Sequence, residues 1–297
     1  MITRRACLGS LFAALTLRNR RVDASAQSYR VGITDAVISG KPNISQSESM
    51  AGTFEVQGKS KCEFEIGTAS DIVKRLDTEE LNLAVLGGLE YAWLKASYSN
   101  LIPLVTAYTL GVRMKACVVV CEESQDKTLM DLQGDSISLP RRLKRHNYVY
   151  LHHAIQKHGG TPDGFFDRVE TPTDSDEGIE SVIAKRVDAI LLDCDSWKAY
   201  QERKATRSKK LRVLEQSGAF PTPVVLYNRS HWKTRDILLL RVALCTAHHR
   251  PYSRQMLNLW GVNKLVLPGR EYQHVLEEVL KEYPEPFTPT MMLAKTK

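Results

Sequence analysis

The chain has 297 residues, enough for one large domain or two medium domains that each bury a full core. Its formal net charge of +7 raises the question of a nucleic-acid partner, but residues 1–26 carry five arginines and only one aspartate. Without that segment the formal charge is about +3, so nucleic-acid binding is not expected. No run of 18 apolar residues follows the segment, so no membrane-spanning helix is expected either.

Residues 1–26 have the three parts of an export signal. Arg4 and Arg5 form a basic start, residues 7–17 form an apolar run, and Ala24-Ser25-Ala26 is a small-x-small cleavage pattern. The arginine pair directly before the apolar run resembles the twin-arginine export signal. The run is too short to cross a bilayer, which takes about 20 residues. We therefore predict export through a cleaved signal to the periplasm or cell exterior, and the alternative is an uncleaved membrane tether.

The next part of the chain alternates between strand-like and helix-like segments. Apolar strands are expected at 29–34, 62–66 and 81–86, and helices at 50–58, at 69–76 and directly after residue 88. Such a β-α-β-α-β-α series is typical of a parallel sheet with helices on its faces.

The third of these strands runs into Gly87-Gly88 and then into a helix. Glycines here permit positive φ angles and a close approach of a ligand, and ligands of open α/β sheets bind at this end of the strands. The alternative is a plain turn that needs glycine for its geometry. Glu90 partly neutralises the positive end of the helix, so we expect the turn to offer backbone hydrogen bonds rather than a strong anion site.

A second α/β series follows two apolar strands that leave the first one. The expected strands are 101–110, 114–121, 136–139, 165–170, 187–192, 209–214 and 224–227. The expected helices are 127–132, 142–157, 174–185, 196–203, 234–248, 253–260 and 271–283. This order predicts one lobe from 28–110 plus 214–297, and a second lobe, 111–213, inserted into it.

Neither a metal site, a cofactor nor a catalytic residue is predicted. Five cysteines remain beyond residue 26, an odd number without metal-ligand spacing, and they are expected to be buried apolar residues. Cys117 and Cys121 share one strand at a separation of about 13 Å, too far for a disulfide. Carboxylates on both sides of Cys194 disfavour its thiolate, which makes it a poor nucleophile. The four histidines between residues 146 and 158 do not share one helix face.

Two charged segments and one aromatic residue are further candidates. Arg141 and Arg142 stand at the start of the helix expected at 142–157, where cations oppose the macrodipole unless an anion binds. The alternative is a solvated basic turn or a docking patch for an acidic partner. Asp174 with the glutamate three residues on resembles a helix capping box. Among the aromatic residues Trp197 is the best candidate for a ligand cleft, and the alternative is a position in the core.

Several short motifs occur in the order found in the phosphate/phosphonate-binding solute receptors of ABC importers. They are LNLAVLGGLEYAWLKA from residue 81, IPLV from 102, MDLQG from 130, SLP from 138, GFF from 164, IESV from 179, VDA from 187, LRVL from 211 and PTP from 221. Between about residues 81 and 241 the chain resembles that family. The resemblance implies an α/β, two-lobed type II periplasmic-binding-protein fold, in which two crossing strands join the lobes and the ligand cleft lies between them.

Carried over residue by residue, the resemblance implies ligand contacts from both lobes. The implied positions are Thr34, Gly87, Gly88, Tyr91, Arg141, Arg142, Ser175, Asp176 and Asp193. The chain departs from the family pattern twice, because the basic stretch 141–146 replaces a serine- and threonine-rich turn and Ser175 replaces a histidine. The ligand is therefore expected to be anionic without being fixed as a phosphonate.

The predicted function is capture of a small anionic ligand, without chemistry, by a monomer that delivers it to an ABC permease in the membrane. One alternative is a periplasmic sensory or interaction protein on the same fold. Another is an enzyme similar to the pyrimidine-precursor synthases, which would need an arrangement of histidine and cysteine that is not found in this sequence.

Overall fold

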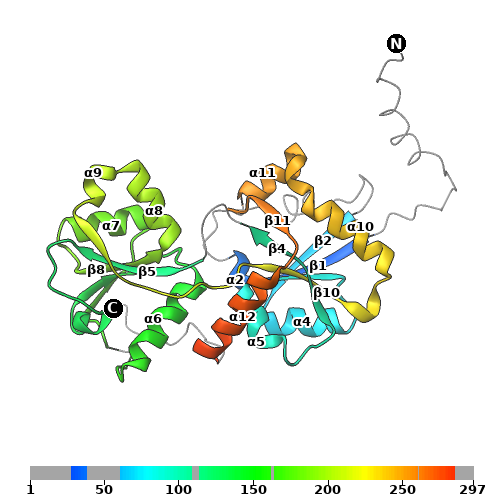
Figure 1. The fold of residues 1–297 in the computed structure, drawn as a ribbon, viewed down its shortest axis with the longest axis horizontal. Helices are drawn as coiled ribbons and strands as arrows, with labels where there is room; N and C mark the ends of the chain where they lie inside the picture. The colour runs from blue at the N-terminus through cyan, green and yellow to red at the C-terminus, as the bar shows by residue number, and fades with distance from the viewer. Residues whose placement is uncertain (1–27, 39–60, 109–113, 162–163, 260, 285–297) are drawn as a thin grey trace, which may run out of the picture.

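The computed structural model describes residues 28–38, 61–108, 114–161, 164–259 and 261–284. They form two α/β lobes, each built on one twisted sheet (Figure 1). The predicted helix at 50–58 and the side chain of Cys62 lie outside the described residues.

The first lobe contains a six-stranded sheet in the order β11-β4-β10-β3-β1-β2. Its strands are β1 (Ser28–Thr34), β2 (Lys61–Gly67), β3 (Leu83–Leu86), β4 (Leu101–Tyr108), β10 (Val224–Asn228) and β11 (Lys264–Val266). The first three strands pair in parallel, as the alternation predicts, whereas β10 is antiparallel to both β3 and β4. The carboxyl ends of β1 and β3 therefore lie side by side at one edge.

The second lobe contains a five-stranded sheet in the order β7-β6-β8-β5-β9. Its strands are β5 (Ala116–Cys121), β6 (Ser136–Ser138), β7 (Arg168–Glu170), β8 (Ala189–Asp193) and β9 (Leu211–Gln216). All five lie between β4 and β10 in the sequence, so this lobe is an insertion into the first one. The chain passes between the lobes twice, from β4 to β5 and back from β9 to β10. We call residues 217–223, which lead from β9 to β10, the returning crossing. Phe220 in the returning crossing pairs with Met114, just before β5, in an antiparallel bridge.

Helices cover both faces of each sheet (Figure 1). The first lobe has α2 (Asp35–Ile38), α4 (Ala69–Asp77), α5 (Gly88–Leu94), α10 (Thr234–Cys245), α11 (Pro251–Leu259) and α12 (Arg270–Glu282). The second has α6 (Arg145–Lys157), α7 (Ser175–Ile183), α8 (Cys194–Arg203) and α9 (Ala205–Ser208). Single 3-10 turns occur at Leu129–Leu132, Arg229–His231 and Ala247–His249. None of the helices in the described ranges is long and apolar enough to cross a membrane.

The buried apolar side chains form three clusters. One cluster packs α10 and α11 against one face of the six-stranded sheet, and another packs α7 and α8 against the five-stranded sheet. The third is continuous between the lobes, where Leu89 and Tyr91 of the first lobe share it with Val118 of the second. Phe220 on the returning crossing belongs to it as well, so the crossing is packed rather than loosely tethered.

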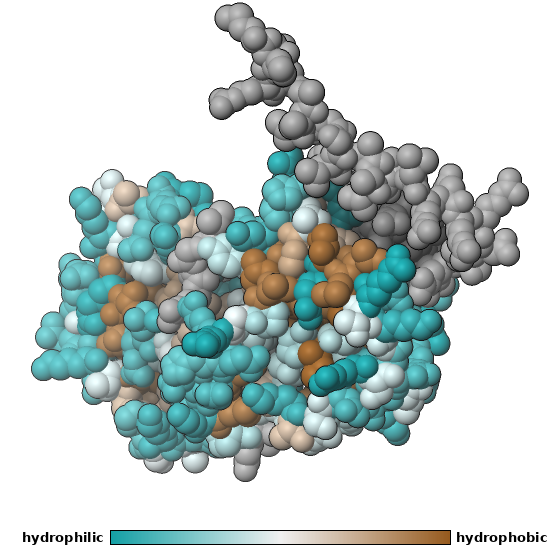
Figure 2. Space-filling view, turned by 45° about the vertical axis from the view of Figure 1, so that its right-hand side comes forward, coloured by the Kyte–Doolittle hydropathy of each residue, from teal (hydrophilic) through white to brown (hydrophobic). Residues whose placement is uncertain are grey.

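Part of α10 turns apolar side chains outward. Leu238, Leu239 and Val242 remain about half exposed or more. Figure 2 shows apolar residues gathered on the side of the molecule where α10 lies in Figure 1. These three side chains lie outside the cavity described below, and substitutions there provide surface controls for the ligand-binding experiments.

Several local predictions are wrong in detail. Helix α6 begins at Arg145 instead of residue 142, because residues 140–143 form a separate turn closed by Leu143 N–H donating to the carbonyl of Pro140. Strand β11 and helix α2 were not predicted, since each has only three or four residues. Of the four cysteines with described side chains, only Cys117 is fully buried. Trp197 stacks on Tyr200 in the core of the second lobe and is no cleft residue.

Candidate functional site

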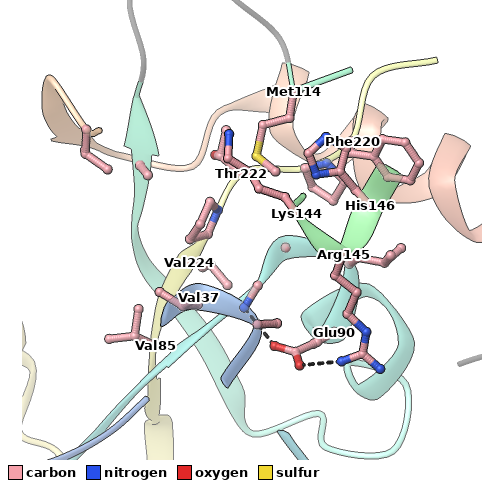
Figure 3. Close-up of a pocket in the computed structure, with 18 of the residues that line it drawn as sticks. Val37, Val85, Glu90, Met114, Lys144, Arg145, His146, Phe220, Thr222 and Val224 are labelled. Carbon is pink, nitrogen blue, oxygen red and sulfur yellow. Dashed lines mark hydrogen bonds and ion pairs between the residues drawn. The ribbon is translucent and has the colours of Figure 1, made fainter. Parts of the chain in front are cut away.

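A cavity of about 190 Å³ lies between the two lobes, at the carboxyl end of β3 (Figure 3). Most of its wall is apolar and comes from the first lobe and from the two connections between the lobes. The main apolar side chains are Val37, Val85, Ala107, Met114, Phe220, Val224, Val262 and Leu265. The second lobe contributes four polar side chains, Lys144, Arg145, His146 and Asp195. A small organic molecule could therefore contact both lobes at once, and it would meet an apolar wall on one side and charged groups on the other.

A buried carboxylate stands where the lobes meet. Glu90 is 4% exposed. Its Oε2 accepts hydrogen bonds from Thr34 Oγ1 at 2.5 Å and from the backbone N–H of Gly87 at 3.0 Å. Its Oε1 accepts from Nη1 of Arg145, which reaches across from α6, at 3.0 Å (Figure 3). Three segments far apart in the sequence are thus held by one side chain.

The charge on Glu90 is only partly compensated. Burial raises the pKa of its carboxyl group, although the hydrogen bonds from Thr34 and Gly87 and the nearby Arg145 guanidinium act in the opposite direction. The Arg145 guanidinium also lies 5.9 Å from the centre of the Trp93 ring, a cation–π contact within the reach of that interaction. The pair of Glu90 and Arg145 is therefore the charged link between the lobes at the cavity.

A second carboxylate, that of Asp193, lies outside the cavity wall and holds side chains at the start of α6. Asp193, at the end of β8, is 9% exposed. It lies 2.9 Å from Nε2 of His146 and 3.3 Å from Nζ of Lys144, and it accepts a hydrogen bond from Nδ2 of Asn147 at 3.3 Å. Burial alone would raise the pKa of Asp193, but His146, Lys144 and Asn147 together lower it to about 2. Asp193 therefore positions two side chains that line the cavity.

Asp195 is a cavity-lining acceptor with spare capacity. Its Oδ1 is buried and has no hydrogen-bond partner among the described residues. Burial raises the pKa of this carboxyl group, which the nearby Lys144 lowers in part. A ligand N–H or O–H group could donate a hydrogen bond to this oxygen.

Close packing of the backbone, and not a positive φ, explains why glycine is present at position 88 of the Gly87-Gly88 turn. Gly87 has a φ of −59°, and Gly88 is the first residue of α5, so neither glycine uses a positive φ. A Cβ atom at Gly88 would lie 2.2 Å from the carbonyl oxygen of Pro221. The returning crossing therefore packs directly on Gly88, and glycine is needed for this approach. Both residues line the cavity.

The predicted ligand positions are brought together only in part. Gly87 and Gly88 line the cavity, and Thr34 lies directly beside it through its hydrogen bond to Glu90. Tyr91 is buried in the shared core, and Arg141 and Arg142 are exposed in the turn before α6. None of these three lines the cavity.

The predicted positions on α7 also lie away from the cavity. Ser175 is the first residue of α7, and Asp176 pairs with Arg203 at 2.7 Å near the surface. The predicted cap is present, since Asp174 accepts from the Glu177 N–H at 2.9 Å while Glu177 accepts from the Thr173 N–H at 2.8 Å. The structural interpretation of this acidic turn is confirmed.

Four side chains that shape the cavity are missing from the predicted ligand positions. Glu90 was interpreted only as a local complement to a helix end, Lys144 and Arg145 were noted only as part of the basic stretch 141–146, and Phe220 was not singled out. Arg145 is the first residue of α6, but the sequence does not show this start, because residues 140–143 form a separate turn in which the Arg141 N–H donates to the distant Pro172 carbonyl. Within the described part of the chain, no group of three or more potential metal ligands occurs.

Solved structures with this arrangement of sheets were found, whereas no curated protein matches the chain by sequence. A protein of Xanthomonas citri bound to ATP has 14% identity and a TM-score of 0.59, over 87% of this chain and 97% of that one. PhnD1 from Prochlorococcus marinus, in complex with methylphosphonate, has 13% identity and a TM-score of 0.57, over 88% and 100%. A binding protein component of an ABC phosphonate transporter from Pseudomonas aeruginosa has 12% identity and a TM-score of 0.54, over 86% and 87%.

At these identities the similarity establishes the fold, which is that of the type II periplasmic binding proteins. The family assignment comes from the sequence itself. Residues 53–269, well over half of the chain, match the family described as the periplasmic substrate-binding protein of phosphonate ABC transporters, and the chain belongs to this family.

Proposed function

We propose that this protein captures a small organic anion with an apolar portion in the cavity between its lobes and delivers it to an ABC permease. The observation that carries the proposal is the composition of the cavity wall, to which both lobes contribute. Closure of the lobes around a solute buries it from two sides, which suits a receptor that must hold and then release its ligand. Members of the family are transport binding proteins, which supports uptake rather than catalysis.

The chemistry of the wall supports an anion larger than phosphate. Apolar side chains such as Val85, Met114 and Phe220 gain free energy only from apolar ligand surface, at about 25 cal/mol per Å². Lys144 offers a cation and Asp195 an acceptor on the opposite side. An organophosphonate or a comparable organic anion that also carries a hydrogen-bond donor satisfies all three features.

A ligand screen by thermal unfolding tests this proposal. An organophosphonate or related organic anion at about 100 times its dissociation constant is expected to stabilise the protein by about 2.7 kcal/mol and to raise its melting temperature. Phosphate, phosphite, carboxylates and amino acids complete the panel. The receptor function is rejected if no solute in the panel shifts the transition.

Variants of the basic segment show which cations serve the ligand. Lys144→Met keeps the aliphatic stem and removes the charge, and it is expected to weaken the response, since Lys144 lines the cavity. Arg141→Ala combined with Arg142→Ala tests the two exposed arginines implied by the family resemblance. If only the double variant loses the response, the ligand contacts Arg141 and Arg142 in the turn before α6 and not Lys144 at the N-cap of this helix.

We also propose that residues 1–26 form a twin-arginine type signal that is cleaved on export, and that the mature protein is a monomer of two lobes. The family is periplasmic, which supports export. Intact-mass measurement of the protein from the periplasm is expected to give a chain that starts after Ala26. A mass that still includes Arg4 and Arg5 would indicate the membrane tether.

A further inference from the structure

The donors around Glu90 form a set that is suited to an oxyanion. A hydroxyl of Thr34, a backbone N–H of Gly87 and the guanidinium of Arg145 converge on one carboxylate from both lobes, the first two at its Oε2 and the third at its Oε1. Charged and neutral donors that converge at 2.5–3.0 Å are the usual means by which proteins hold carboxylate, phosphate and phosphonate groups. We call Thr34, Gly87 and Arg145 the oxyanion cradle.

The oxyanion cradle is filled by the protein's own carboxylate. The side chain of Glu90 is 5% exposed, and it also forms part of the cavity wall (Figure 3). A free anion that enters the cavity would have to displace an acceptor that is covalently attached and already bonded to all three donors. It would also approach a like charge in a poorly solvated place, which is unfavourable.

We propose that Glu90 is a specificity-determining residue, which occupies the oxyanion cradle in place of a ligand and keeps small tetrahedral oxyanions such as phosphate and methylphosphonate out of it. This inference rests on the proposed function, and it narrows the substrate class. Ligands must then be recognised through their apolar portion and through polar groups near Lys144 and Asp195. Anions without an apolar portion are therefore expected to bind weakly to the wild-type protein.

The competing explanation is that Glu90 only holds the lobes together. Both explanations predict that removing its carboxylate lowers stability, since the buried donors lose their acceptor. They differ in what happens when an anion is added. A purely structural carboxylate leaves no binding site behind, whereas a stand-in for a ligand leaves a set of donors that a small anion can fill.

Calorimetric titration of methylphosphonate and of phosphate, at constant ionic strength, separates the two. Glu90→Ala is expected to bind methylphosphonate at least tenfold more tightly than the wild-type protein. Formate, which resembles the missing carboxylate, is expected to raise the melting temperature of Glu90→Ala above that seen with chloride. Wild-type protein that binds methylphosphonate as tightly as the variant would overturn the proposal.

Glu215→Ala is the matched control. Glu215 is a partly buried carboxylate that, like Glu90, accepts from a hydroxyl and a backbone N–H, here those of Tyr150 and Leu129, but it lies outside the cavity. This variant is expected to lose stability without gaining affinity for any anion. If Glu215→Ala gains the same affinity for anions, loss of stability by itself is enough to allow anion binding. This result would contradict a role specific to Glu90.

Glu90→Gln covers the case in which the alanine variant does not fold. Glutamine keeps an oxygen acceptor for Thr34 and Gly87 and removes the charge that pairs with Arg145. It is expected to gain at least threefold in affinity for methylphosphonate. If neither variant folds, the carboxylate is required by the fold itself, and the specificity role is rejected. The ligand screen of the wild-type protein is a separate experiment. If the wild-type protein binds no solute in that screen, the proposed receptor function is rejected, but the role of Glu90 is still decided by comparing the variants.

Discussion

Replacing Asp193 with alanine is expected to lower the free energy of unfolding by about 3 kcal/mol, the lower end of the range for breaking a buried ion pair from one side. Asp193 is 9% exposed, and its carboxylate has contacts with Lys144, the N-cap residue of α6, and with His146 and Asn147 in the first turn of that helix. Without it these groups lose their common partner inside the protein. Urea denaturation followed by circular dichroism measures the effect.

The same substitution is expected to weaken ligand binding, since Lys144 and His146 line the cavity and Asp193 holds both in place. Asp176→Ala is the control, because Asp176 also pairs with a cation, Arg203, but at the surface. An exposed pair of this kind contributes about 0–1 kcal/mol. If the two substitutions lower the free energy of unfolding equally, the burial of Asp193 does not strengthen the contribution of its ion pairs to stability.

Asp193 also gives the protein a characteristic response to acid. Its pKa in the folded protein is about 2, below the ordinary value of 3.8, so the unfolded chain takes up the proton first as the pH falls. The stabilisation is therefore complete above about pH 4 and is lost between pH 4 and pH 2. The shift corresponds to about 2 kcal/mol. In Asp193→Ala this part of the acid-induced loss of stability is expected to disappear.

The elements of this fold could be predicted largely because their signals are local. The apolar runs that became β3, β5 and β8 are visible in the sequence, and their alternation with helices indicates α/β lobes. The start of α6 could not be placed correctly, because residues 140–143 form a separate turn, and the Arg141 N–H in this turn donates to the Pro172 carbonyl, 31 positions away. Short elements such as β11 have too few residues for a periodic pattern.

The site was less predictable than the fold, because its key contacts join residues that are far apart in the sequence. Gly87 was predicted from the carboxyl end of a parallel strand, where ligands of such sheets bind, whereas Thr34 was implied only by the family resemblance. The role of Glu90 depends on Thr34, 56 positions away, and on Arg145, 55 positions away. No local pattern encodes these separations, so the glutamate looked like an ordinary residue in the first turn of a helix.

Gly88→Ala is expected to destabilise the protein by about 3 kcal/mol, the upper end of the usual range for overpacking. A Cβ atom at this position would lie 2.2 Å from the carbonyl oxygen of Pro221 and 2.5 Å from that of Thr222. Both are backbone atoms, so no side-chain rotation relieves the contact. The returning crossing must move away from α5, and this opens the cavity wall that the two segments share.

The sign of the effect is informative, because helix propensity alone predicts the opposite. Alanine is favoured over glycine within a helix by about 1 kcal/mol, and Gly88 has a helical conformation. Gly87→Ala is the matched control, since the φ of −59° suits any residue and its Cβ would lie 3.2 Å from Oε2 of Glu90, a side-chain atom that needs to shift by only a few tenths of an ångström. It is expected to change stability by less than about 1 kcal/mol. If Gly88→Ala proves neutral or stabilising in urea denaturation, the crossing does not pack on this helix, and the cavity between the lobes is more open than the structure indicates.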